Sequence, residues 1–398
     1  MVETRPQTAR PTPPRSLTIL GATGSVGTSA LDLVANSPGA FEIIALTAQN
    51  NVEQLIAAAI KHRARLAVIA DETHYAALKA GLAGTGIRAA AGAQALIDAA
   101  CEPADCVLAA IMGIAGLAPT LAAVGQGRRV ALANKECLVA AGHLFMDLVA
   151  DAQTELLPVD SEHSAVHQAL VGASADAIER IVLTASGGPF RTWSTAQMAK
   201  ATPAAALKHP NWSMGQKICI DSATWMNKGL ELIEAFHLFP VTADQLAVVV
   251  HPQSIIHALV EYRDGSVMAQ MGAPDMRTPI AYALGWPQRI QAPTARLDLI
   301  KLGQLTFEAP DEARFPALAL ARAAMVRGGA ATTILNGANE MAVGAFLDRR
   351  IGFTDIARTV ESCLNRAERK GVVRQPQNLA DVLELDGIAR QLARDVIG

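Results

Sequence analysis

The segment SLTILGATGSVGTSALDLVANS (16–37) decides the fold of this chain. Its first five residues predict a buried strand, the glycine-rich GATGSVG (21–27) predicts a turn, and the remainder predicts a helix that ends before Pro38. A second apolar strand, FEIIALTA, follows at 41–48. In such a βαβ unit the N–H groups of the glycine turn and the dipole of the helix favour a pyrophosphate. A tight turn that needs glycine for its backbone alone is the alternative.

The same alternation of strand and helix continues after this unit. Helices are predicted at 52–62 and 72–82, and apolar strands at 64–70, from Val107 and at 130–133. Apolar strands that alternate with helices imply a parallel sheet covered by helices on both faces. The predicted fold class is therefore α/β, with a Rossmann-like parallel sheet at the N-terminus.

The rest of the chain has a different texture. Strands with two-faced alternation at 178–185, 246–252 and 266–272 predict a central α+β domain. A proline-rich irregular stretch suits a linker, and helical apolar spacing near the end predicts a C-terminal helical domain. The predicted boundaries are a disordered extension at 1–16, a nucleotide-binding domain at 17–150, a central domain at 151–285, a linker at 286–315 and the helical domain at 316–398.

Composition and charge exclude several classes of protein. The 398 residues are 51% hydrophobic, which suits a globular chain with a large core. The formal net charge is −3, so the chain lacks the basic excess with which proteins bind nucleic acid or an anionic membrane. A small soluble substrate is the expected partner. The uncharged run at 107–124 contains Gly113, Gly116 and Pro119, and it predicts a strand, a turn and a helix rather than a membrane span.

The cysteines show neither the spacing of a zinc ribbon nor a disulfide framework, and we expect reduced thiols in a cytoplasmic protein. Residues 1–16 precede no apolar stretch that suits a signal peptide, although their arginines leave an organelle address open. The five cysteines are Cys101, Cys106, Cys137, Cys219 and Cys363.

The second predicted strand ends at Gln49, Asn50 and Asn51, where an NAD-preferring site usually places an acid on the ribose hydroxyls. No acid at this point repels a 2′-phosphate, so the sequence favours NADPH over NADH. Positive charge is available nearby in the sequence, in the stretch 62–65 that contains His62, Arg63 and Arg65. A solvated helix end is the alternative for that stretch.

Asn134, Lys135 and Glu136 follow the strand at 130–133. In open α/β sheets ligands bind beyond the carboxyl ends of the strands, so these three residues are candidate ligand contacts. An ordinary polar loop that caps the next helix is the alternative.

Two acids, Asp160 and Glu162, lie close together in ELLPVDSE (155–162). On an extended backbone their side chains point to the same face. Like charges so close favour a cation between them, and carboxylate oxygens suit Mg²⁺ or Mn²⁺. A solvated strand end is the alternative. His163 and His167 lack the HExxH order of zinc proteases, and we interpret them as hydrogen-bonded structural residues.

A third acid lies in IDSATWMNKGLELIEAF (220–236), which predicts one helix capped near Asp221 or Ser222. Gly229 costs such a helix roughly 1 kcal/mol relative to alanine, which indicates a close approach by ligand or backbone. A surface ion pair with a tolerated glycine is the alternative. The residues that share one face of this helix, by i+3 and i+4 spacing, are Asn227, Lys228 and Glu231.

Two loops complete the predicted site. SGGPF (186–190) offers a hydroxyl and a nest of backbone N–H groups that suits phosphate oxygens, with a plain turn as the alternative. KHPNWSMG (208–215) carries Trp212 and Met214, and we expect it to close over an apolar group such as a nicotinamide ring. Anchoring of this loop to the core is the alternative.

Six motifs together resemble the 1-deoxy-D-xylulose 5-phosphate reductoisomerase family, and they stand in that family's order: GATGSVG, ANKE, LLPVDSEH, SGGPF, HPNWSMG and KICIDSATWMNKGLELIEA. The resemblance extends from Leu17 through HPQSIIH (251–257) and GAPDMRTPIA (272–281) into NGANEMAVGAFL (336–347), almost the whole chain. It implies an N-terminal NADPH-binding domain, a central catalytic and dimerisation domain with a lid near 205–217, a C-terminal helical domain and a homodimer.

The resemblance also implies roles for individual residues. One departure is that the family often has glycine followed by Lys, Arg or Ser where this chain has Gln49-Asn50, which moves the expected hold on the 2′-phosphate toward 62–65. The residues that match metal ligands are Asp160, Glu162 and Glu231, and with Lys135 they are the expected catalytic residues. The residues that match substrate contacts are Lys135, Ser161, Glu162, Ser186, His209, Ser222, Asn227, Lys228 and Glu231. The residues that match NADPH contacts are Thr23, Gly24, Ser25, Val26, Gln49, Asn50, Asn51, Asn134, Glu136 and Gly215.

The implied reaction uses a divalent metal, Mg²⁺ or Mn²⁺ with Co²⁺ as an alternative, to polarise the ketone of a phosphorylated sugar. Carbon–carbon cleavage and rejoining then give a branched aldehyde, which NADPH reduces to 2-C-methyl-D-erythritol 4-phosphate, a precursor of isoprenoids. A different Rossmann dehydrogenase, of the semialdehyde or homoserine type, explains the glycine motif but gives no role to the three acids. A non-catalytic dinucleotide sensor would lack the acids or Lys228, and all of them are present.

Overall fold

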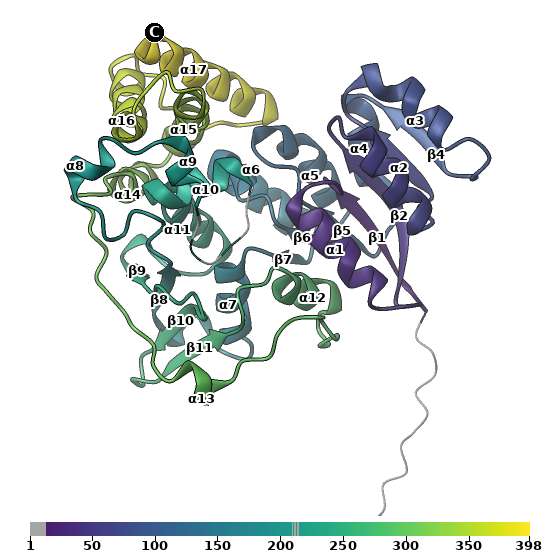
Figure 1. Ribbon diagram of the computed structural model, residues 1–398, viewed down its shortest axis with the longest axis horizontal. Helices are drawn as coiled ribbons and strands as arrows, with labels where there is room; N and C mark the ends of the chain where they lie inside the picture. The colour runs from purple at the N-terminus through teal and green to yellow at the C-terminus, as the bar shows by residue number, and fades with distance from the viewer. Residues whose placement is uncertain (1–12, 209, 211, 213–214) are drawn as a thin grey trace, which may run out of the picture.

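The computed structural model describes residues 13–208, 210, 212 and 215–398, and its N-terminal part is built on a seven-stranded sheet (Figure 1). Its strands are β1 (Arg15–Leu20), β2 (Phe41–Ala48), β3 (Leu66–Ile69), β4 (Arg88–Ala91), β5 (Cys106–Ala109), β6 (Arg129–Leu132) and β7 (Leu156–Pro158). All neighbouring pairs are parallel, in the order β4-β3-β2-β1-β5-β6-β7. The order reverses between β1 and β5, and such a switch point is where α/β sheets bind ligands.

Helices cover both faces of this sheet, as predicted. Leu17 and Ile19 of β1 face one buried cluster, and Leu20 faces another, because side chains alternate along a strand. The buried run at 107–124 forms a strand, a short turn and a helix, as predicted. The helices of this part are α1 (Ser25–Ala35), α2 (Val52–Lys61), α3 (Tyr75–Gly81), α4 (Ala93–Cys101), α5 (Leu117–Val124) and α6 (Glu136–Asp151).

The predicted N-terminal extension at 1–16 is two residues too long. Arg15 and Ser16 belong to β1, and Arg15 Nη1 donates a hydrogen bond to the carbonyl oxygen of Leu284 at 2.6 Å. Asp105 Oδ2 accepts hydrogen bonds from both the backbone N–H and the hydroxyl of Ser16 at 2.7 Å. Both residues are therefore held in place at the start of the first strand.

The second sheet has four strands in the order β11-β10-β8-β9, with β8 and β9 parallel and the other pairs antiparallel. These strands are β8 (Ile178–Ala185), β9 (Leu246–Val250), β10 (Ile256–Tyr262) and β11 (Val267–Met271). The helices of this central part are α7 (Ser161–Ala169), α8 (Thr195–Met198), α9 (Pro203–Ala206), α10 (Gln216–Thr224), α11 (Met226–Leu238), α12 (Arg277–Gly285) and α13 (Leu299–Leu302).

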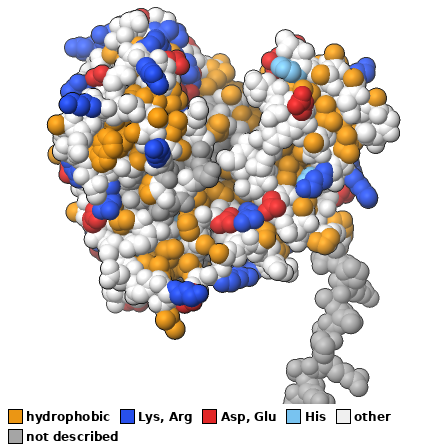
Figure 2. Space-filling view, viewed as in Figure 1, with side chains coloured by type: hydrophobic (Ala, Val, Ile, Leu, Met, Phe, Trp, Pro, Cys, Tyr) orange, Lys and Arg blue, Asp and Glu red, His pale blue; other side chains and the backbone are white. Residues whose placement is uncertain are grey.

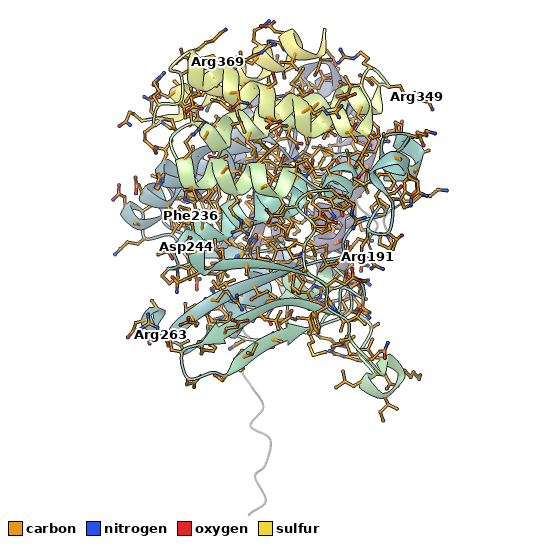
Figure 3. All side chains as sticks on the ribbon, turned by 90° about the vertical axis from the view of Figure 1, so that its left-hand side faces the viewer. Arg191, Phe236, Asp244, Arg263, Arg349 and Arg369 are labelled. Carbon is orange, nitrogen blue, oxygen red and sulfur yellow. The ribbon has the colours of Figure 1, made fainter. Side chains whose placement is uncertain are left out.

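The C-terminal part consists of four helices that stand above the second sheet in the views of Figures 1 and 3. One buried cluster joins these helices to the sheet. It contains Ile181 and Leu183 of the sheet together with Leu335 and Phe346 of the helices. The C-terminal helices therefore share a core with the central sheet instead of enclosing one of their own. They are α14 (Ala317–Arg327), α15 (Ala331–Leu347), α16 (Phe353–Arg369) and α17 (Leu379–Ile397).

Helix α12 lies in the predicted central domain by sequence, but it packs against the N-terminal part. Ile280, Ala283 and Leu284 of α12 belong to the same buried cluster as Leu17 and Ile19 of the first sheet. Helix α12 thus follows the second sheet in the chain and packs against the first. On the face of the molecule turned to the viewer in Figure 2, an indentation separates the N-terminal part from the rest. Among the described residues, none of the helices combines the length and the apolar character that crossing a bilayer requires.

Candidate active site

A cavity of about 320 Å³ lies between the first sheet, α7 and α11. Its wall combines residues from α1, from the loop after β6, from the start of α7, from the loop after β8 and from the junction of α10 and α11. The predicted site residues that line it are Ser25, Val26, Lys135, Asp160, Ser161, Glu162, Ser186, Ser222, Asn227, Lys228 and Glu231. Residues more than 200 positions apart in the chain thus meet in one cavity.

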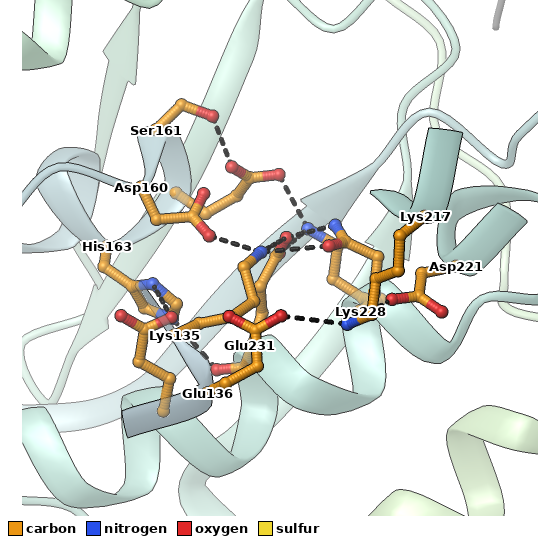
Figure 4. Close-up of polar contacts among 12 residues, drawn as sticks. Lys135, Glu136, Asp160, Ser161, His163, Lys217, Asp221, Lys228 and Glu231 are labelled. Atoms are coloured by element: carbon orange, nitrogen blue, oxygen red, sulfur yellow. Dashed lines mark hydrogen bonds and ion pairs between the residues drawn. The ribbon is translucent and has the colours of Figure 1, made fainter. Parts of the chain in front are cut away.

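The three predicted metal ligands converge in this cavity (Figure 4). One carboxylate oxygen from each of Asp160, Glu162 and Glu231 lies within 4.8 Å of the other two. The route to this geometry differs from the prediction, which assumed an extended backbone. Asp160 is the N-cap residue of α7, and Glu162 lies in the first turn of that helix. The helix start, and not strand alternation, turns both acids toward Glu231 on α11.

Two lysine ammonium groups lie among the three acids. Lys135 Nζ is 2.5 Å from Asp160 Oδ2 and 3.0 Å from Glu231 Oε1. Lys228 Nζ is 2.7 Å from Glu162 Oε1, and it also pairs with Glu231 Oε2. Asn227 accepts a hydrogen bond from Lys135 Nζ at 2.9 Å through Oδ1 and donates one to Glu231 through Nδ2. The predicted face of Asn227, Lys228 and Glu231 is therefore directed into the cavity.

Burial and neighbouring charges set the protonation of these groups. Burial and then the carboxylate of Glu231 raise the pKa of Glu162 to about 7, against the opposing effect of Lys228. Burial also acts to raise the pKa of Asp160, but the ammonium of Lys135 outweighs it and holds this pKa well below its ordinary value. Burial acts to lower the pKa of Lys135, and the acids Asp160 and Glu231 raise it above its ordinary value. Glu162 thus takes up a proton more readily than Asp160 does.

The two histidines after Glu162 both form hydrogen bonds, as predicted, although His163 also lies with Asp160 and Glu234 in a second group whose ligand atoms are within 4.8 Å of one another. His163 Nε2 donates to the carbonyl oxygen of Glu231 at 2.9 Å, and its Nδ1 lies 3.1 Å from Glu234 Oε2. Burial lowers the pKa of His163, but the Glu234 carboxylate reverses this and raises it to about 9. His167 Nδ1 is 2.7 Å from the hydroxyl oxygen of Tyr282 on α12. His163 therefore holds the backbone of Glu231, one of the predicted metal ligands.

The segment 220–236 forms parts of two helices, whereas the sequence predicted one helix capped near Asp221 or Ser222. Both of those residues lie inside α10, and the break falls at Trp225, whose φ of 68° is left-handed. The indole stacks on Phe315 with ring centroids 4.4 Å apart, and its Nε1 donates to the carbonyl oxygen of Gly187 at 3.0 Å. This break turns Ser222 at the end of α10 and Asn227 at the start of α11 into the same cavity.

The predicted phosphate nest lies between β8 and α8. Gly187 and Gly188 have φ angles of 81° and 68°, a conformation that glycine adopts without strain. A Cβ on Gly188 would lie 2.6 Å from the carbonyl oxygen of Ser222, so glycine is needed for this approach. The N–H of Gly188 donates to Ser186 Oγ at 3.1 Å. The nest therefore holds Ser186 beside Ser222 on the cavity wall.

The glycine turn lies at the switch point of the first sheet. Gly21 has a φ of 88°, and a Cβ at this position would lie 2.7 Å from the carbonyl oxygen of Ala110, just after β5. Gly24 is the N-cap residue of α1 and is exposed, and Thr23 lies beside it in the turn. Gln49, Asn50 and Asn51 are exposed at the carboxyl end of β2. The turn and this strand end both lie where the carboxyl ends of the parallel strands meet, which we call the ligand edge. A dinucleotide would lie there.

The basic stretch 62–65 does not lie at that edge, contrary to the prediction that it supports a 2′-phosphate. It precedes β3, whose start pairs with the middle of β2, and the N–H of Arg65 donates to the carbonyl oxygen of Ile43. Its guanidinium pairs with Glu42, at the amino end of β2. In a parallel sheet the amino ends of the strands face away from the ligand edge. The stretch 62–65 thus lies at the amino ends of the strands, opposite the ligand edge.

Asn134 and Glu136 flank Lys135, which lines the cavity. Asn134 Nδ2 donates to the carbonyl oxygen of Gly113 at 3.0 Å, and its buried Oδ1 accepts no hydrogen bond from the described residues. Glu136 is the first residue of α6 and pairs with Lys217 at 2.9 Å. An orphaned buried acceptor beside the loop after β5 fits a ligand that brings its own donor, such as a nicotinamide carboxamide.

The predicted lid is described in part. His209, Asn211, Ser213 and Met214 lie outside the described residues. Trp212 lines the cavity, and its ring centroid is 6.0 Å from that of His257. Gly215 is the N-cap residue of α10, and a Cβ there would approach Met112 Sδ at 4.0 Å. The C-terminal end of the predicted lid thus lies between the cavity and the loop after β5.

Sequence reasoning missed part of the cavity wall. Ser254 lines it from the segment before β10, His257 from the start of β10, and Asp275 and Met276 from the segment before α12. Burial lowers the pKa of His257 to about 4, so this imidazole is neutral over most of the pH range. Both segments were recognisable in the sequence, because the motifs HPQSIIH (251–257) and GAPDMRTPIA (272–281) carry part of the family resemblance. No role was predicted for either motif.

Comparison with known families gives a consistent result along the chain. The family model described as "1-deoxy-D-xylulose 5-phosphate reductoisomerase" matches residues 17–142. The model of a C-terminal domain of that family matches residues 156–239, and "DXP reductoisomerase C-terminal domain" matches residues 271–392.

Individual relatives agree with these family models. The chain is 58% identical over 379 residues to 1-deoxy-D-xylulose 5-phosphate reductoisomerase of Afipia carboxidovorans, covering 95% of this chain and 93% of the relative. It is 56% identical to the protein of that name from Rhodospirillum centenum, over 96% of this chain and 94% of the relative.

Solved structures of proteins with that name have the same fold. The Zymomonas mobilis protein in complex with NADPH matches with a TM-score of 0.91 and 52% identity, over 96% of this chain and 99% of that chain. A DOX-P reductoisomerase in complex with NADPH, fosmidomycin and magnesium matches with a TM-score of 0.93 and 44% identity, over 96% and 98% of the two chains.

Proposed function

The chain belongs to the 1-deoxy-D-xylulose 5-phosphate reductoisomerase family, and from this premise we propose which of its residues bind metal, sugar phosphate and cofactor. It is an NADP-dependent oxidoreductase that uses NADPH and a divalent metal ion. It converts 1-deoxy-D-xylulose 5-phosphate to 2-C-methyl-D-erythritol 4-phosphate, a step toward isoprenoids. The observation that carries the residue assignments is the meeting of three carboxylates in the cavity beside the glycine turn.

Asp160, Glu162 and Glu231 are the proposed metal ligands. Three oxygens within 4.8 Å of one another match the oxygen donors that Mg²⁺ and Mn²⁺ prefer, with Co²⁺ as an alternative. When Glu162 is deprotonated, the three negative charges exceed the two positive charges of Lys135 and Lys228, and the site then attracts a cation. When bound, the metal ion polarises the substrate ketone as a Lewis acid, and NADPH supplies the hydride.

Lys135 is the proposed residue that stabilises charge on the reacting oxygens. Its ammonium lies 2.5 Å from Asp160 and 3.0 Å from Glu231, so it is held beside the atoms that hold the metal. A preorganised cation in a cavity with little water is worth more to a developing negative charge than the same cation in solution. Ser161, at the start of α7, donates to Glu162 and lines the cavity as a further substrate contact.

The substrate phosphate is the proposed ligand of the nest after β8. Ser186, held by the N–H of Gly188, and Ser222 supply hydroxyls, and Asn227 and Lys228 supply an amide and an ammonium. Lys228 becomes available to the phosphate once its partners Glu162 and Glu231 turn to the metal ion. Binding energy from the phosphate then orients the reacting carbons. His209 remains a proposed substrate contact by family resemblance.

NADPH is proposed to bind along the switch point of the first sheet. The turn at 21–27 receives the pyrophosphate at the start of α1, and 49–51 lie beside the adenosine ribose. Asn134, with its orphaned Oδ1, lies where the nicotinamide half reaches the metal site, and Glu136 and Gly215 lie near it. Thr23, Gly24, Ser25 and Val26 form the turn itself.

A homodimer is proposed on the free edge of the second sheet. Strand β11 is an edge strand, and Val267 and Met268 on it are 52% and 53% exposed. An uncovered edge strand with exposed apolar side chains favours pairing with another chain, and a two-fold axis pairs the strand with its own copy. Sedimentation of the native chain should give a dimer, and Met268→Lys should give monomer. A monomeric native chain would contradict this proposal.

A cytoplasmic location is proposed on the five cysteines. None of the five forms a disulfide in the structure, and four of them are buried. Buried cysteines without disulfides suit a reducing compartment.

The reaction is tested by following NADPH absorbance after addition of 1-deoxy-D-xylulose 5-phosphate. With Mg²⁺ or Mn²⁺ the absorbance should fall, and EDTA should stop the fall until metal is restored. An absence of NADPH oxidation with both metals would contradict the proposed function. Oxidation that EDTA leaves unchanged would remove the metal from the mechanism.

A further inference from the structure

A second group of buried charges lies where the three parts of the chain meet, apart from the metal-ligand triad. Lys217 and Asp221 are one turn apart on α10, Glu136 begins α6 beside the first sheet, and Asn339 lies on α15 of the C-terminal part. Lys217 Nζ is 2.9 Å from Glu136 Oε1 and 2.8 Å from Asp221 Oδ2. Asn339 Nδ2 donates to Asp221 Oδ1 at 2.8 Å. Figure 4 shows Lys217 between the two acids.

This group depends on a single ammonium. Glu136 and Asp221 are only 6% and 1% exposed, and Lys217 is the one ion-pair partner that either acid has within the described part of the chain. Burial acts to raise the pKa of Glu136, but Lys217 outweighs it and holds this pKa below its ordinary value. Loss of the ammonium would leave two neighbouring carboxylates buried without a cation, which is the costly way to break a buried ion pair.

The C-terminal part holds this group from the far side. Asn339 is fully buried and orients the Asp221 carboxylate through one oxygen, which leaves the other for Lys217. Its neighbour Glu340 pairs with Arg390 and approaches the loop after β5, where a Cβ on Gly113 would lie 3.1 Å from Glu340 Oε1. The same loop accepts the hydrogen bond from Asn134. Helix α15 therefore supports both residues that flank Lys135.

We propose that Lys217 is a positioning residue for the cofactor site, whose ammonium fixes the Glu136 carboxylate and is itself fixed by Asp221 and Asn339. This inference rests on the proposed function in one respect, the contact between Glu136 and NADPH. Lys217 acts on NADPH through Glu136 and has no part in holding the metal ion, because its acids are separate from Asp160, Glu162 and Glu231.

The test measures NADPH binding directly, by quenching of tryptophan fluorescence in the absence of substrate, and turnover separately. Lys217→Met should raise the NADPH Kd and KM roughly tenfold, with kcat at saturating NADPH and the affinity for Mn²⁺ little changed. Lys217→Arg keeps the charge and should recover most of the affinity. Lys301→Met, at an exposed lysine paired with Asp298, is the matched control and should behave as the native chain.

A double-mutant cycle decides whether Lys217 acts through Glu136. Glu136→Gln alone should weaken NADPH binding, and adding Lys217→Met to it should weaken binding little further. An undiminished effect of Lys217→Met in that background would overturn the proposal. So would a loss of kcat with an unchanged NADPH Kd.

A further variant keeps the proposal testable if Lys217→Met does not fold. Asn339→Ala leaves both ion pairs in place and should raise the NADPH Kd by a smaller factor in the same direction, whereas an unchanged Kd would count against the relay through Asp221. Failure of the proposed function has a different signature, because the native chain would then not oxidise NADPH at all with substrate and metal.

Discussion

Five charged side chains share the cavity, and the two lysines lower the cost of burying the three acids. Lys135 and Lys228 each contact two of the three acids, so no carboxylate of the triad lacks a cation. The identity of these residues was predictable from the motifs. Their geometry was not, because PVDSE reads as extended chain, whereas Ser161 begins a helix and Asp160 caps it. A helix start and a strand both bring such acids together, and sequence alone does not distinguish them.

The raised pKa of Glu162 predicts a pH-dependent metal affinity. In the metal-free protein Glu162 has a pKa of about 7, so below pH 7 a proton competes with the ion for this carboxylate. The apparent Kd for Mg²⁺ should therefore rise about tenfold between pH 8 and pH 6 and change little above pH 8. Calorimetric titration at these pH values measures it, and Glu162→Gln should remove the pH dependence. A Kd that is constant from pH 6 to pH 8 would show that Glu162 is not a ligand.

The same shift fixes the sign of one contribution to stability. The pKa of Glu162 in the folded chain lies above its ordinary value of 4.5, so the folded state holds the proton more tightly than the unfolded state. Proton binding by Glu162 therefore stabilises the folded state fully below pH 4.5, and this stabilisation is lost as the pH rises through about 7. Metal binding offsets this loss in the range where the carboxylate is charged.

Asn50 is the residue that we expect to decide between NADPH and NADH. The basic stretch 62–65 was a misleading signal, since closeness in sequence does not reveal which end of a parallel strand a residue occupies. Arg65 is held by Glu42 at the far edge of the sheet, and Asn50 is exposed at the ligand edge. Asn50→Asp should raise the NADPH KM by about tenfold through repulsion of the 2′-phosphate, with the NADH KM unchanged or lower. Asn50→Arg should lower the NADPH KM.

Steady-state kinetics with both cofactors measures this preference. Arg65→Ala is the matched control at the far edge and should leave both KM values as in the native chain. If Arg65→Ala weakened NADPH binding as much as Asn50→Asp, the assignment of the ligand edge would be wrong.

The break between α10 and α11 illustrates what an element owes to distant residues. Trp225 adopts a left-handed backbone conformation, which costs free energy for a residue with a side chain. Stacking on Phe315 and the hydrogen bond to Gly187 offset that cost, and both partners are remote in the sequence. The prediction of a single helix failed for this reason. Without the break, Ser222 and Asn227 would not face one cavity.

The contact between α11 and α14 gives a prediction about packing. A Cβ on Gly229 would overlap the methyl carbon of Ala321, so the glycine permits a close helix–helix approach, through a side chain and not through the ligand or backbone that the sequence predicted. Gly229→Ala should destabilise the protein by about 1–3 kcal/mol. Gly387→Ala is the matched control, because Gly387 lies in the interior of α17 with no atom near its missing Cβ. That change should stabilise by about 0.5–1 kcal/mol.

Thermal unfolding followed by circular dichroism measures both changes, which should have opposite signs. A stabilising Gly229→Ala would mean that α11 and α14 are not in close contact in solution.

Across the whole molecule, the N-terminal sheet was the most predictable part. Five of its strands are apolar and were predicted from the alternation of strand and helix. The other two were missed, because β4 is exposed or half-buried and β7 lies within the predicted central domain. The relation between the parts was not predictable. Helix α12 joins the first sheet through Ile280 and Leu284, and the C-terminal helices share the core of the second sheet. Amphipathic spacing shows that a helix is buried on one face, but not against which element.

The central claim is that three carboxylates from two segments form one metal site in this chain. Binding of Mn²⁺, measured by the loss of its free electron paramagnetic resonance signal, tests this claim directly. The native chain should bind one Mn²⁺ tightly, and Glu231→Gln should weaken this binding more than about tenfold while the NADPH Kd is unchanged. Glu261→Gln, at a glutamate of β10 paired with Arg180, is the matched control and should bind as the native chain does. Equal Mn²⁺ affinity in the native chain and Glu231→Gln would contradict the account.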